Sequence, residues 1–432
     1  MIFDTIVAPI TGSQPAAVAI VRISGPDAWM IAAAVFPNFP KEPESHKAIY
    51  GHYRTGDDGL VLPFAEHHSY TGEQSVEFSC HGSPASVRAI IEECLDAGAR
   101  NARPGEFTER AFLHGRIDLT KAEAVAETVN AQTEAQLRVA NRLRDGALFK
   151  EVSALRDRVL KVLGTIEATV DFEEEIGPLD VAATIREMDA IAERLEPLIK
   201  SAALGRIIRN GLRVAIIGPP NAGKSSLFNA IVGHERAIVT PVAGTTRDYL
   251  EEAIDVHGIP VVFIDTAGLR ETEEVVESLG VERSRLQAEQ ADMTWFVYDA
   301  TTKFPGSNAT YIIANKSDLL NKQDWPPNNF DRQYLVSAKT GEGISKVLRA
   351  MSAVAEEAAA LQVPPPNERH VGRLQASLEC IRDSKAVLVD DRPFDLLSTL
   401  LRGAANHLGE ITGETASADM IERIFADFCI GK

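Results

Sequence analysis

The segment around residue 220 constrains the fold of this chain more than any other. An apolar run at 212–217 leads into Gly218-Pro219-Pro220-Asn221-Ala222-Gly223-Lys224-Ser225, and a helix-like stretch at 226–231 follows. A glycine-rich loop between a strand and a helix lets backbone N–H groups surround phosphate oxygens at the positive end of the helix. We expect Lys224 to neutralise the β- and γ-phosphates and Ser225 to bind Mg²⁺. The other residues expected at the phosphates are Asn221, Ala222, Gly223 and Ser226.

Two further segments follow in the order that a nucleotide switch requires. Asp265-Thr266-Ala267-Gly268 comes directly after the apolar run 261–264. We expect Asp265 to hold the water shell of Mg²⁺ and the Gly268 N–H to meet the γ-phosphate, together with Thr266 and Ala267. Gly244-Thr245-Thr246-Arg247-Asp248 lies between the two motifs, and Thr246 is the expected second Mg²⁺ ligand. Loss of the γ-phosphate would release the loop after Gly268, which predicts a switch.

The choice of base is predicted by Asn315-Lys316-Ser317-Asp318. A carboxylate accepts hydrogen bonds from both N1–H and the exocyclic amino group of guanine, whereas adenine would leave a buried Asp318 unpaired. We expect Lys316 to lie over the base and Asn315 to tie this loop to the phosphate loop. Ser337-Ala338-Lys339 fits as a second loop beside the base. Together the motifs predict GTP rather than ATP.

One departure from the common pattern concerns water activation. Many small GTPases have glutamine directly after the Asp-x-x-Gly turn, but this chain has Leu269, which cannot hydrogen-bond water. Another polar group or a cation must then orient the water. Glu277 is the candidate, although from the residues alone a solvated charge in the acidic stretch 271–282 is the better interpretation.

The periodicity of the chain changes at three points and predicts four segments. Residues 1–115 read as a mixed α/β module, with strands expected at 18–23, 49–53 and 75–80 and helices at 28–35 and from Ser83-Pro84 onward. Residues 116–210 and 361–432 read as helical, whereas 211–360 alternate short strands with turns, as in a doubly wound parallel sheet. We therefore expect a multidomain α/β plus all-α protein, in which a P-loop, Ras-like domain interrupts a helical domain.

Composition excludes several classes of protein. The formal charge of −18 argues against holding nucleic acid by bulk electrostatics, so any RNA contact would use a local patch or a basic partner. No apolar run is long enough to span a bilayer, and the first residues lack the features of a signal peptide. The four cysteines are scattered without a CxxC pair, so we expect a cytoplasmic protein with reduced thiols and no membrane contact.

Other motifs resemble the MnmE (TrmE) family of tRNA-modification GTPases, and the likeness runs through the whole chain. Residues 105–113, Gly-Glu-Phe-Thr-Glu-Arg-Ala-Phe-Leu, with Arg116-Ile117-Asp118-Leu119 are similar to the signature that follows the family's N-terminal domain. Residues 244–248 and 265–270 match its switch loops, and Cys429-Ile430-Gly431-Lys432 matches its C-terminal tetrapeptide.

The resemblance implies an N-terminal α+β folate-binding domain that dimerises, a central helical domain and an inserted G domain. It also implies action with the flavoprotein MnmG, in a hetero-oligomer, on C5 of the wobble uridine of certain tRNAs. A carboxymethylaminomethyl- or aminomethyl-type group would be installed there, with 5-formyl- or methylene-tetrahydrofolate supplying the one-carbon unit. GTP hydrolysis would require K⁺ as well as Mg²⁺.

Several residue roles are carried over from the family. K⁺ would be bound by Asn221, Thr240, Val242 and Thr245, where it supplies the charge of an arginine finger, and Glu277 would orient the water. Lys224 and Thr245 belong to the same catalytic set. Folate would be bound by Arg22, Glu77, Arg116 and Lys432, and Cys429 is a candidate for one-carbon transfer or else a small apolar tail residue.

Two departures and two rivals stay open at this point. Ala16-Ala17-Val18-Ala19 replaces the family's glycine-rich segment, and only the 11 residues of 300–310 separate two expected strands, so one crossover helix is expected to be trimmed. A GTPase binding switch in ribosome assembly would share the nucleotide motifs but have no use for Arg22, Glu77 and Cys429. A scaffold with a vestigial GTPase is disfavoured by the intact Lys224 and Asp318.

Overall fold

A computed structural model describes residues 4–12, 15–234, 236–237, 252–256, 258–264, 291–321, 332–390, 393–426 and 428–431. The chain forms two compact units. The first unit comprises Met1–Ala126, Leu143–Met188 and Glu379–Lys432, and the second comprises Glu127–Arg142 and Asp189–Leu378. In the described part of the chain, no helix has both the length and the apolar composition that a membrane crossing requires.

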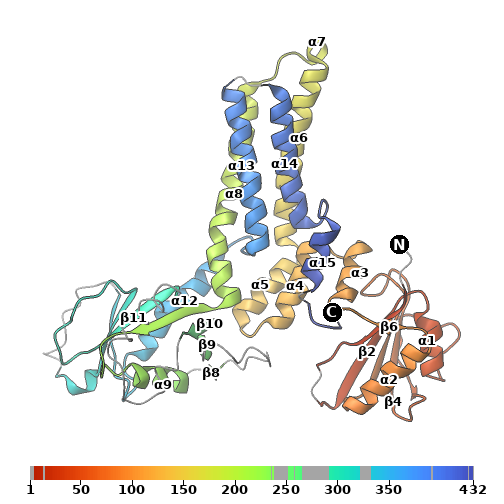
Figure 1. Ribbon diagram of the computed structural model, residues 1–432, viewed down its shortest axis with the longest axis horizontal. Helices are drawn as coiled ribbons and strands as arrows, with labels where there is room; N and C mark the ends of the chain where they lie inside the picture. Colours follow the sequence, from red (N-terminus) through yellow and green to blue (C-terminus); the bar gives the residue numbers. More distant parts are fainter. Residues whose placement is uncertain are drawn as a thin grey trace. The chain divides into compact units, whose positions relative to one another are not determined.

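The first unit contains a six-stranded sheet whose order is β3-β4-β5-β2-β1-β6. Helices α1 and α2 lie on one face of this sheet (Figure 1), where their apolar stripes meet alternate residues of the strands, such as Val21 and Phe78. The strands are β1 (Ile6–Pro9), β2 (Val18–Ser24), β3 (Ile49–His52), β4 (Asp58–Phe64), β5 (Ser75–His81) and β6 (Arg100–Asn101). The helices are α1 (Ala28–Val35) and α2 (Pro84–Asp96).

Local sequence signals explain where α2 begins. The Ser83 hydroxyl accepts the N–H of Ser86 at 3.0 Å, and Pro84 occupies the first turn, where its missing N–H costs nothing. The predicted helices at 28–35 and from Ser83-Pro84 onward are therefore confirmed. Strands β1, β4 and β6 were not predicted, because their short mixed sequences lack a clear period.

Helix α3 (Glu106–Leu113) is joined to the sheet by a buried charge network. Its Arg110 side chain is 1% exposed and lies 2.9 Å from Asp4, 3.0 Å from Glu73 and 3.0 Å from Glu106. Arg100 adds a second cation on Glu106 at 2.5 Å. Burial of a lone charge is costly, so each member of this network depends on the others. This role for the signature motif at 105–113 was not foreseen from the sequence.

The network predicts a loss of stability in acid. Burial acts to raise the pKa of Glu106, but hydrogen bonds from Arg100, the Arg103 N–H and Arg110 outweigh it and lower that pKa from 4.5 to about 2. The lowered value contributes stability above pH 4.5, and this contribution is lost as the pH falls towards 2. We expect the midpoint of urea unfolding to fall as the pH is lowered from 4.5 towards 2. Trp29 fluorescence would report this midpoint in a chain whose Trp295 and Trp325 are changed to phenylalanine. A Glu106→Gln variant should show a flatter pH profile; an unchanged slope would contradict the assignment.

Long helices make up the rest of the first unit. Helices α6 (Ala147–Asp171) and α14 (Phe394–Thr412) pack along each other (Figure 1). The ion pair Glu167–Arg402 joins them at 2.6 Å, and Arg156 pairs at 2.6 Å with Glu414 in the turn after α14. The predicted apolar stripe of α6 is buried, which confirms that helix. Its members are Val152, Leu155, Val159, Val162, Leu163 and Ile166. Two more of the described helices, α7 (Glu173–Ile176) and α15 (Ala418–Ala426), lie wholly in this unit.

Four described helices have residues in both units: α4 (Leu119–Asn130), α5 (Glu134–Arg144), α8 (Val181–Asn210) and α13 (Glu368–Val389). In the second unit, α5 contacts both the end of α8 and the segment that precedes α13. Gln136 Nε2 donates to the Arg209 carbonyl at 3.0 Å, and the Arg142 guanidinium donates to the carbonyls of Leu361 and Gln362. Arg209 itself donates to the carbonyls of Pro365 and Pro366 and pairs with Glu127 at 2.6 Å. The two ends of the intervening α/β segment are therefore held together.

That segment contains a seven-stranded sheet of order β13-β12-β11-β7-β10-β9-β8. The strands are β7 (Leu212–Ile217), β8 (Arg236–Ala237), β9 (Glu252–Val256), β10 (Ile259–Phe263), β11 (Met293–Asp299), β12 (Tyr311–Asn315) and β13 (Gln333–Leu335). The five strands from β13 to β10 are parallel, but β9 is antiparallel to β10, and β8 to β9. The expectation of a parallel sheet is thus wrong at one edge, because a two-residue connection between β9 and β10 permits only a hairpin.

The connection between β11 and β12 crosses over without a helix. Residues 300–310 form turns and extended chain, although the two strands they join are parallel neighbours. Phe304 from this connection packs against Phe296 and Tyr298, with ring centroids 6.1 Å and 5.2 Å away. The trimmed helix expected at this point is therefore absent from 300–310, and an aromatic side chain covers part of the sheet instead. The described helices α9 (Lys224–His234) and α12 (Ile344–Ala360) pack with residues of this sheet in a separate hydrophobic core.

Candidate nucleotide-binding site

The candidate site lies where the parallel strands end. Loop 218–223 connects β7 to α9, and its two glycines are required because neighbouring atoms leave no room for a side chain. A Cβ on Gly218 would lie 2.0 Å from the Val297 carbonyl oxygen, and one on Gly223 would lie 2.4 Å from Asn315 Nδ2. Asn221, at the tip of the loop, is exposed and has φ 59°, a left-handed conformation that asparagine tolerates better than most residues.

Lys224 begins α9, and its side chain turns back over the loop. Its Nζ donates to the carbonyls of Gly218 at 3.0 Å and Pro219 at 2.9 Å. Burial lowers the pKa of Lys224. The ammonium group thus lies inside the curve of the loop, where phosphate oxygens would take over its hydrogen bonds. Ser225 and Ser226 follow in the first turn of α9, where free N–H groups favour an anion.

Asn315 joins three loops. Its side chain is buried: Nδ2 donates to the Ala222 carbonyl at 3.0 Å, and Oδ1 accepts the Ala338 N–H at 3.0 Å. The predicted tie between the base loop and the phosphate loop is present, and it extends to the Ser337-Ala338-Lys339 loop. This end of the sheet therefore carries one connected site.

Asp318 and Ser337 face each other beside this tie. The Ser337 hydroxyl donates to Asp318 Oδ1 at 2.6 Å, and the Thr340 N–H donates to the same hydroxyl at 3.2 Å. Asp318 is exposed in the short helical turn Ser317–Leu319, and its role at the base stays a prediction. Ser337 thus holds one oxygen of this carboxylate, and Lys339, two residues further along the chain, is exposed.

Lys316 has a partner that sequence reasoning missed. Its Nζ donates to Asp299 Oδ2 at 2.7 Å, while Asp299 Oδ1 accepts the N–H and the hydroxyl of Thr301 at 3.0 and 2.7 Å. Burial acts to raise the pKa of Asp299, but the bonds from Lys316 and Thr301 outweigh it and lower that pKa. The sequence signal that could have revealed this ion pair is the carboxylate at the end of β11, because β11 lies next to β12 in the sheet.

Asp299 is expected to position Lys316 for the base. An Asp299→Asn variant would keep the shape but lose the charge that holds the ammonium group, so we expect the affinity for a fluorescent GDP analogue to fall about five- to tenfold, equivalent to ~1–1.4 kcal/mol. Glu342→Gln removes an exposed carboxylate from the adjoining loop and should leave the affinity unchanged. Equal affinities for the two variants would contradict this role.

The remaining predicted nucleotide and metal residues lie outside the described residues. They are Thr240, Val242, Thr245, Thr246, Asp265, Thr266, Ala267, Gly268 and Glu277. Lys432, predicted to bind folate, lies outside them as well. Their roles stay predictions.

The predicted folate residues Arg22 and Glu77 meet on the sheet of the first unit. They are directly opposite on β2 and β5, and Arg22 Nη2 lies 2.7 Å from Glu77 Oε1. The guanidinium carbon is 5.1 Å from the centre of the Tyr70 ring and 5.5 Å from that of Phe107. At these distances both rings attract the cation through cation–π interactions. Arg116 is exposed, and its Cγ would lie 3.3 Å from a Cβ on Gly72.

The C-terminal tail lies against the same sheet. Cys429 is exposed, and its carbonyl accepts the Gly105 N–H at 3.4 Å. A Cβ on Gly431 would lie 2.1 Å from the carbonyl oxygen of Pro9, the last residue of β1. Because the neighbouring Ala8 pairs with Arg22, the structure brings the tail to the strand beside this arginine.

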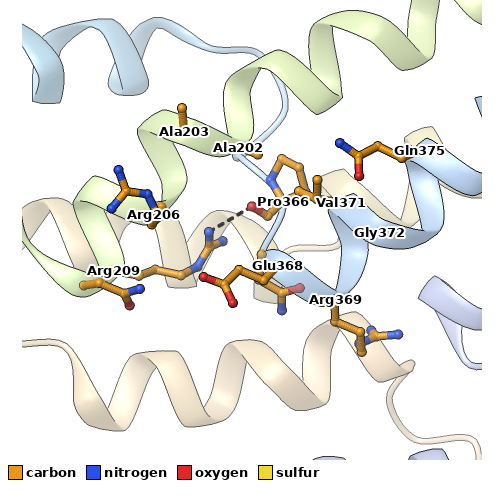
Figure 2. Close-up of a pocket in the computed structure, with 12 residues that line it drawn as sticks. Ala202, Ala203, Arg206, Arg209, Pro366, Glu368, Arg369, Val371, Gly372 and Gln375 are labelled. Atoms are coloured by element: carbon orange, nitrogen blue, oxygen red, sulfur yellow. Dashed lines mark hydrogen bonds between the residues drawn. The ribbon is translucent and has the colours of Figure 1, made fainter. Parts of the chain in front are cut away.

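A separate cavity of about 640 Å³ lies in the second unit, between the end of α8 and the start of α13 (Figure 2). Arg206, Arg209 and Arg369 line it, and the hydrogen bond from Arg209 to Pro366 crosses one wall. None of the predicted site residues that the structure describes lines this cavity.

The phosphate loop, the base loop and the Asn315 tie at the ends of parallel strands define a P-loop GTP-binding protein. Comparison with known proteins then narrows the class. Residues 5–116 match the family description "GTP-binding protein TrmE N-terminus", and residues 119–429 match "MnmE helical domain". The chain belongs to the MnmE family of tRNA modification GTPases.

Curated relatives match this chain along its whole length. Proteins named tRNA modification GTPase MnmE are 42% identical in Chloroflexus aurantiacus and 37% identical in Aquifex aeolicus, each covering 99% of this chain and 100% of the relative. The relative from Desulforamulus reducens is 38% identical over 100% of both chains. Among solved structures, the FeoB G domain of Methanococcus jannaschii matches 34% of this chain and 98% of its own, at 22% identity and a TM-score of 0.24.

Proposed function

We propose that this chain hydrolyses GTP with K⁺ and Mg²⁺ and uses the cycle in modifying C5 of the wobble uridine of certain tRNAs. It would act in the cytoplasm as a homodimer, with the flavoprotein MnmG as partner and a tetrahydrofolate as one-carbon donor. The observation that carries the proposal is the match of the whole chain to relatives named tRNA modification GTPases. The domain limits 1–115, 116–210, 211–360 and 361–432 belong to the same proposal.

The residues of the phosphate loop fit the two cations. Ser225, at the first turn of α9, presents the hydroxyl that Mg²⁺ prefers, and Thr246 would supply a second. Asn221 is exposed at the loop tip and offers an amide oxygen, so it fits a K⁺ site completed by Thr240, Val242 and Thr245. A bound monovalent cation would supply positive charge to the transition state. Lys224 would bind the β- and γ-phosphates, and Glu277 would hold the water.

Arg22 and Glu77 fit a folate in a different way. The arginine is already oriented by the carboxylate and by the rings of Tyr70 and Phe107, so little rotamer entropy remains to be lost on binding. The exposed thiol of Cys429 is carried on the tail beside β1, so a role in one-carbon transfer fits its place. Arg116 and Lys432 would complete the site.

The cation requirement is testable on the full chain. Turnover of GTP in KCl should exceed turnover in NaCl of equal ionic strength by about tenfold or more, because loss of one transition-state charge contact costs about 10²–10³ in other enzymes. Asn221→Gly removes the amide oxygen without backbone strain and should abolish the difference. Asn229→Ala, an exposed asparagine on α9, should keep it. Equal turnover in both salts would overturn the proposed cation chemistry.

The tRNA role needs a separate measurement. Mass spectrometry of tRNA nucleosides should show loss of the C5-modified wobble uridine in a deletion strain and its return with the wild-type chain, but not with Lys224→Ala. Unchanged wobble uridines would overturn the tRNA function.

A further inference from the structure

The face of the first sheet opposite α1 and α2 carries a row of histidine and aspartate side chains. His52 on β3 pairs directly with Asp58 on β4, and β4 pairs with β5 through Leu60 and Ser79. Continuing that register by two residues places Asp58 opposite His81. Directly opposed residues of antiparallel strands project from the same face. His52, Asp58 and His81 therefore form one row across three strands.

A second carboxylate reaches this row from the turn before β4. His81 Nδ1 lies 2.6 Å from Asp57 Oδ1, and the ligand atoms of Asp57, Asp58 and His81 all lie within 4.8 Å of one another. Backbone N–H groups hold Asp57: that of Asp58 donates to Oδ1 at 2.9 Å and that of His81 to Oδ2 at 3.3 Å. The Tyr50 hydroxyl donates to Asp58 Oδ2 at 2.9 Å. Hydrogen bonds of this kind orient ligands around a metal ion.

The donor set indicates the class of ion. One imidazole with two carboxylates suits Zn²⁺ and similar transition metals, whereas Ca²⁺ and Mg²⁺ select oxygen ligands alone. Tetrahedral bonds of about 2.0–2.1 Å place neighbouring donors about 3.3 Å apart. The 2.6 Å contact between His81 and Asp57 is proton-bridged, so an ion would require these atoms to separate by under about 1 Å. The His81 side chain is 64% exposed and has room to move.

We propose that Asp57, Asp58 and His81 bind a divalent transition metal ion of the Zn²⁺ type, with His52 as a fourth donor. The site is separate from the nucleotide loop and from Arg22 and Glu77. A bound ion would clamp the turn between β3 and β4 to the end of β5. It would thereby stiffen the strands at that edge of the sheet.

The test is a Zn²⁺ titration of the metal-depleted full chain against a metallochromic indicator. Excess Mg²⁺ and GDP keep the nucleotide site filled, and a Cys429→Ser background removes the exposed thiol. We expect one equivalent of Zn²⁺ that is lost, or weakened about 100-fold or more, in His81→Gln and in Asp57→Asn. His52→Gln should weaken it about tenfold. His67→Gln is the matched control, because this histidine is 84% exposed, lies 3.9 Å from Glu66 and has no third ligand among the residues that the structure describes.

A second readout separates binding from folding. Zn²⁺ should raise the urea midpoint reported by Trp29 in the wild type and in His67→Gln, but not in His81→Gln. Circular dichroism without metal shows whether each variant is folded. Equal Zn²⁺ stoichiometry and affinity in the wild type, His81→Gln and Asp57→Asn would overturn the site. So would a wild-type chain that takes up no Zn²⁺ at micromolar concentration, in which case the cluster is an ordinary surface ion pair.

Discussion

Asp318→Asn is expected to lower the affinity for GTP about 10³-fold, equivalent to ~4 kcal/mol, and to create affinity for xanthosine triphosphate. The carboxylate accepts two hydrogen bonds from guanine, whereas an amide can accept one and leaves a donor facing the exocyclic amino group. Xanthine carries an oxygen at that position and pairs with the amide. Ser337, whose hydroxyl donates to Asp318 Oδ1, can still donate to the amide oxygen and keep the side chain in place.

Equilibrium binding of fluorescent guanosine and xanthosine nucleotides to the full chain would measure both changes. The wild type must reject the xanthosine nucleotide for the comparison to hold. A variant that binds GTP within about threefold of the wild type would contradict the assignment of Asp318 to the base.

Arg110→Met is expected to cost about 3–5 kcal/mol of stability in the first unit. The substitution keeps most of the side-chain volume but leaves Glu73 and Glu106, 9% and 3% exposed, without their shared cation. Asp4 would lose one of its two arginines. Urea unfolding followed by Trp29 fluorescence, in the background without Trp295 and Trp325, reports on this sheet.

Arg103→Met is the matched control for this experiment. Arg103 also pairs with Glu106, at 3.6 Å, and with Glu109, at 3.1 Å, but its own side chain is 57% exposed. Exposed pairs contribute about 0–1 kcal/mol, so its midpoint should barely move. Similar losses for the two variants would show that burial does not govern this network.

The nucleotide loops were predictable because their chemistry is local. The Gly-rich loop from 218 to 223 lies between a strand and a helix, and one buried asparagine, Asn315, connects it to the base loop as expected. Motif residues that must touch one ligand are drawn together by the parallel strands, whose ends meet at one edge. The exposure of Asp318 was not predictable, since it depends on how a three-residue turn is seated.

Features with partners far along the chain were missed. Arg110 meets Asp4 across 106 residues, and Asp299 meets Lys316 only because β11 and β12 are neighbours. Periodicity shows which face of an element is apolar, but not which distant charge lies opposite. The antiparallel edge formed by β8 and β9 was missed because neither strand was predicted: one has two residues, and the other, Glu252–Val256, contains two carboxylates and is no apolar run.

The hydrogen bonds that hold the two ends of the α/β segment together have a consequence for engineering. Arg209 bonds the Pro365 and Pro366 carbonyls, and Gln136 and Arg142 hold the flanking backbone, so the exit and re-entry points are already neighbours. Closing a gap between fixed neighbours costs little chain entropy. A short glycine–serine bridge in place of the whole α/β segment should leave a helical remainder that folds, and a foreign domain with adjacent termini should be tolerated at the same junction.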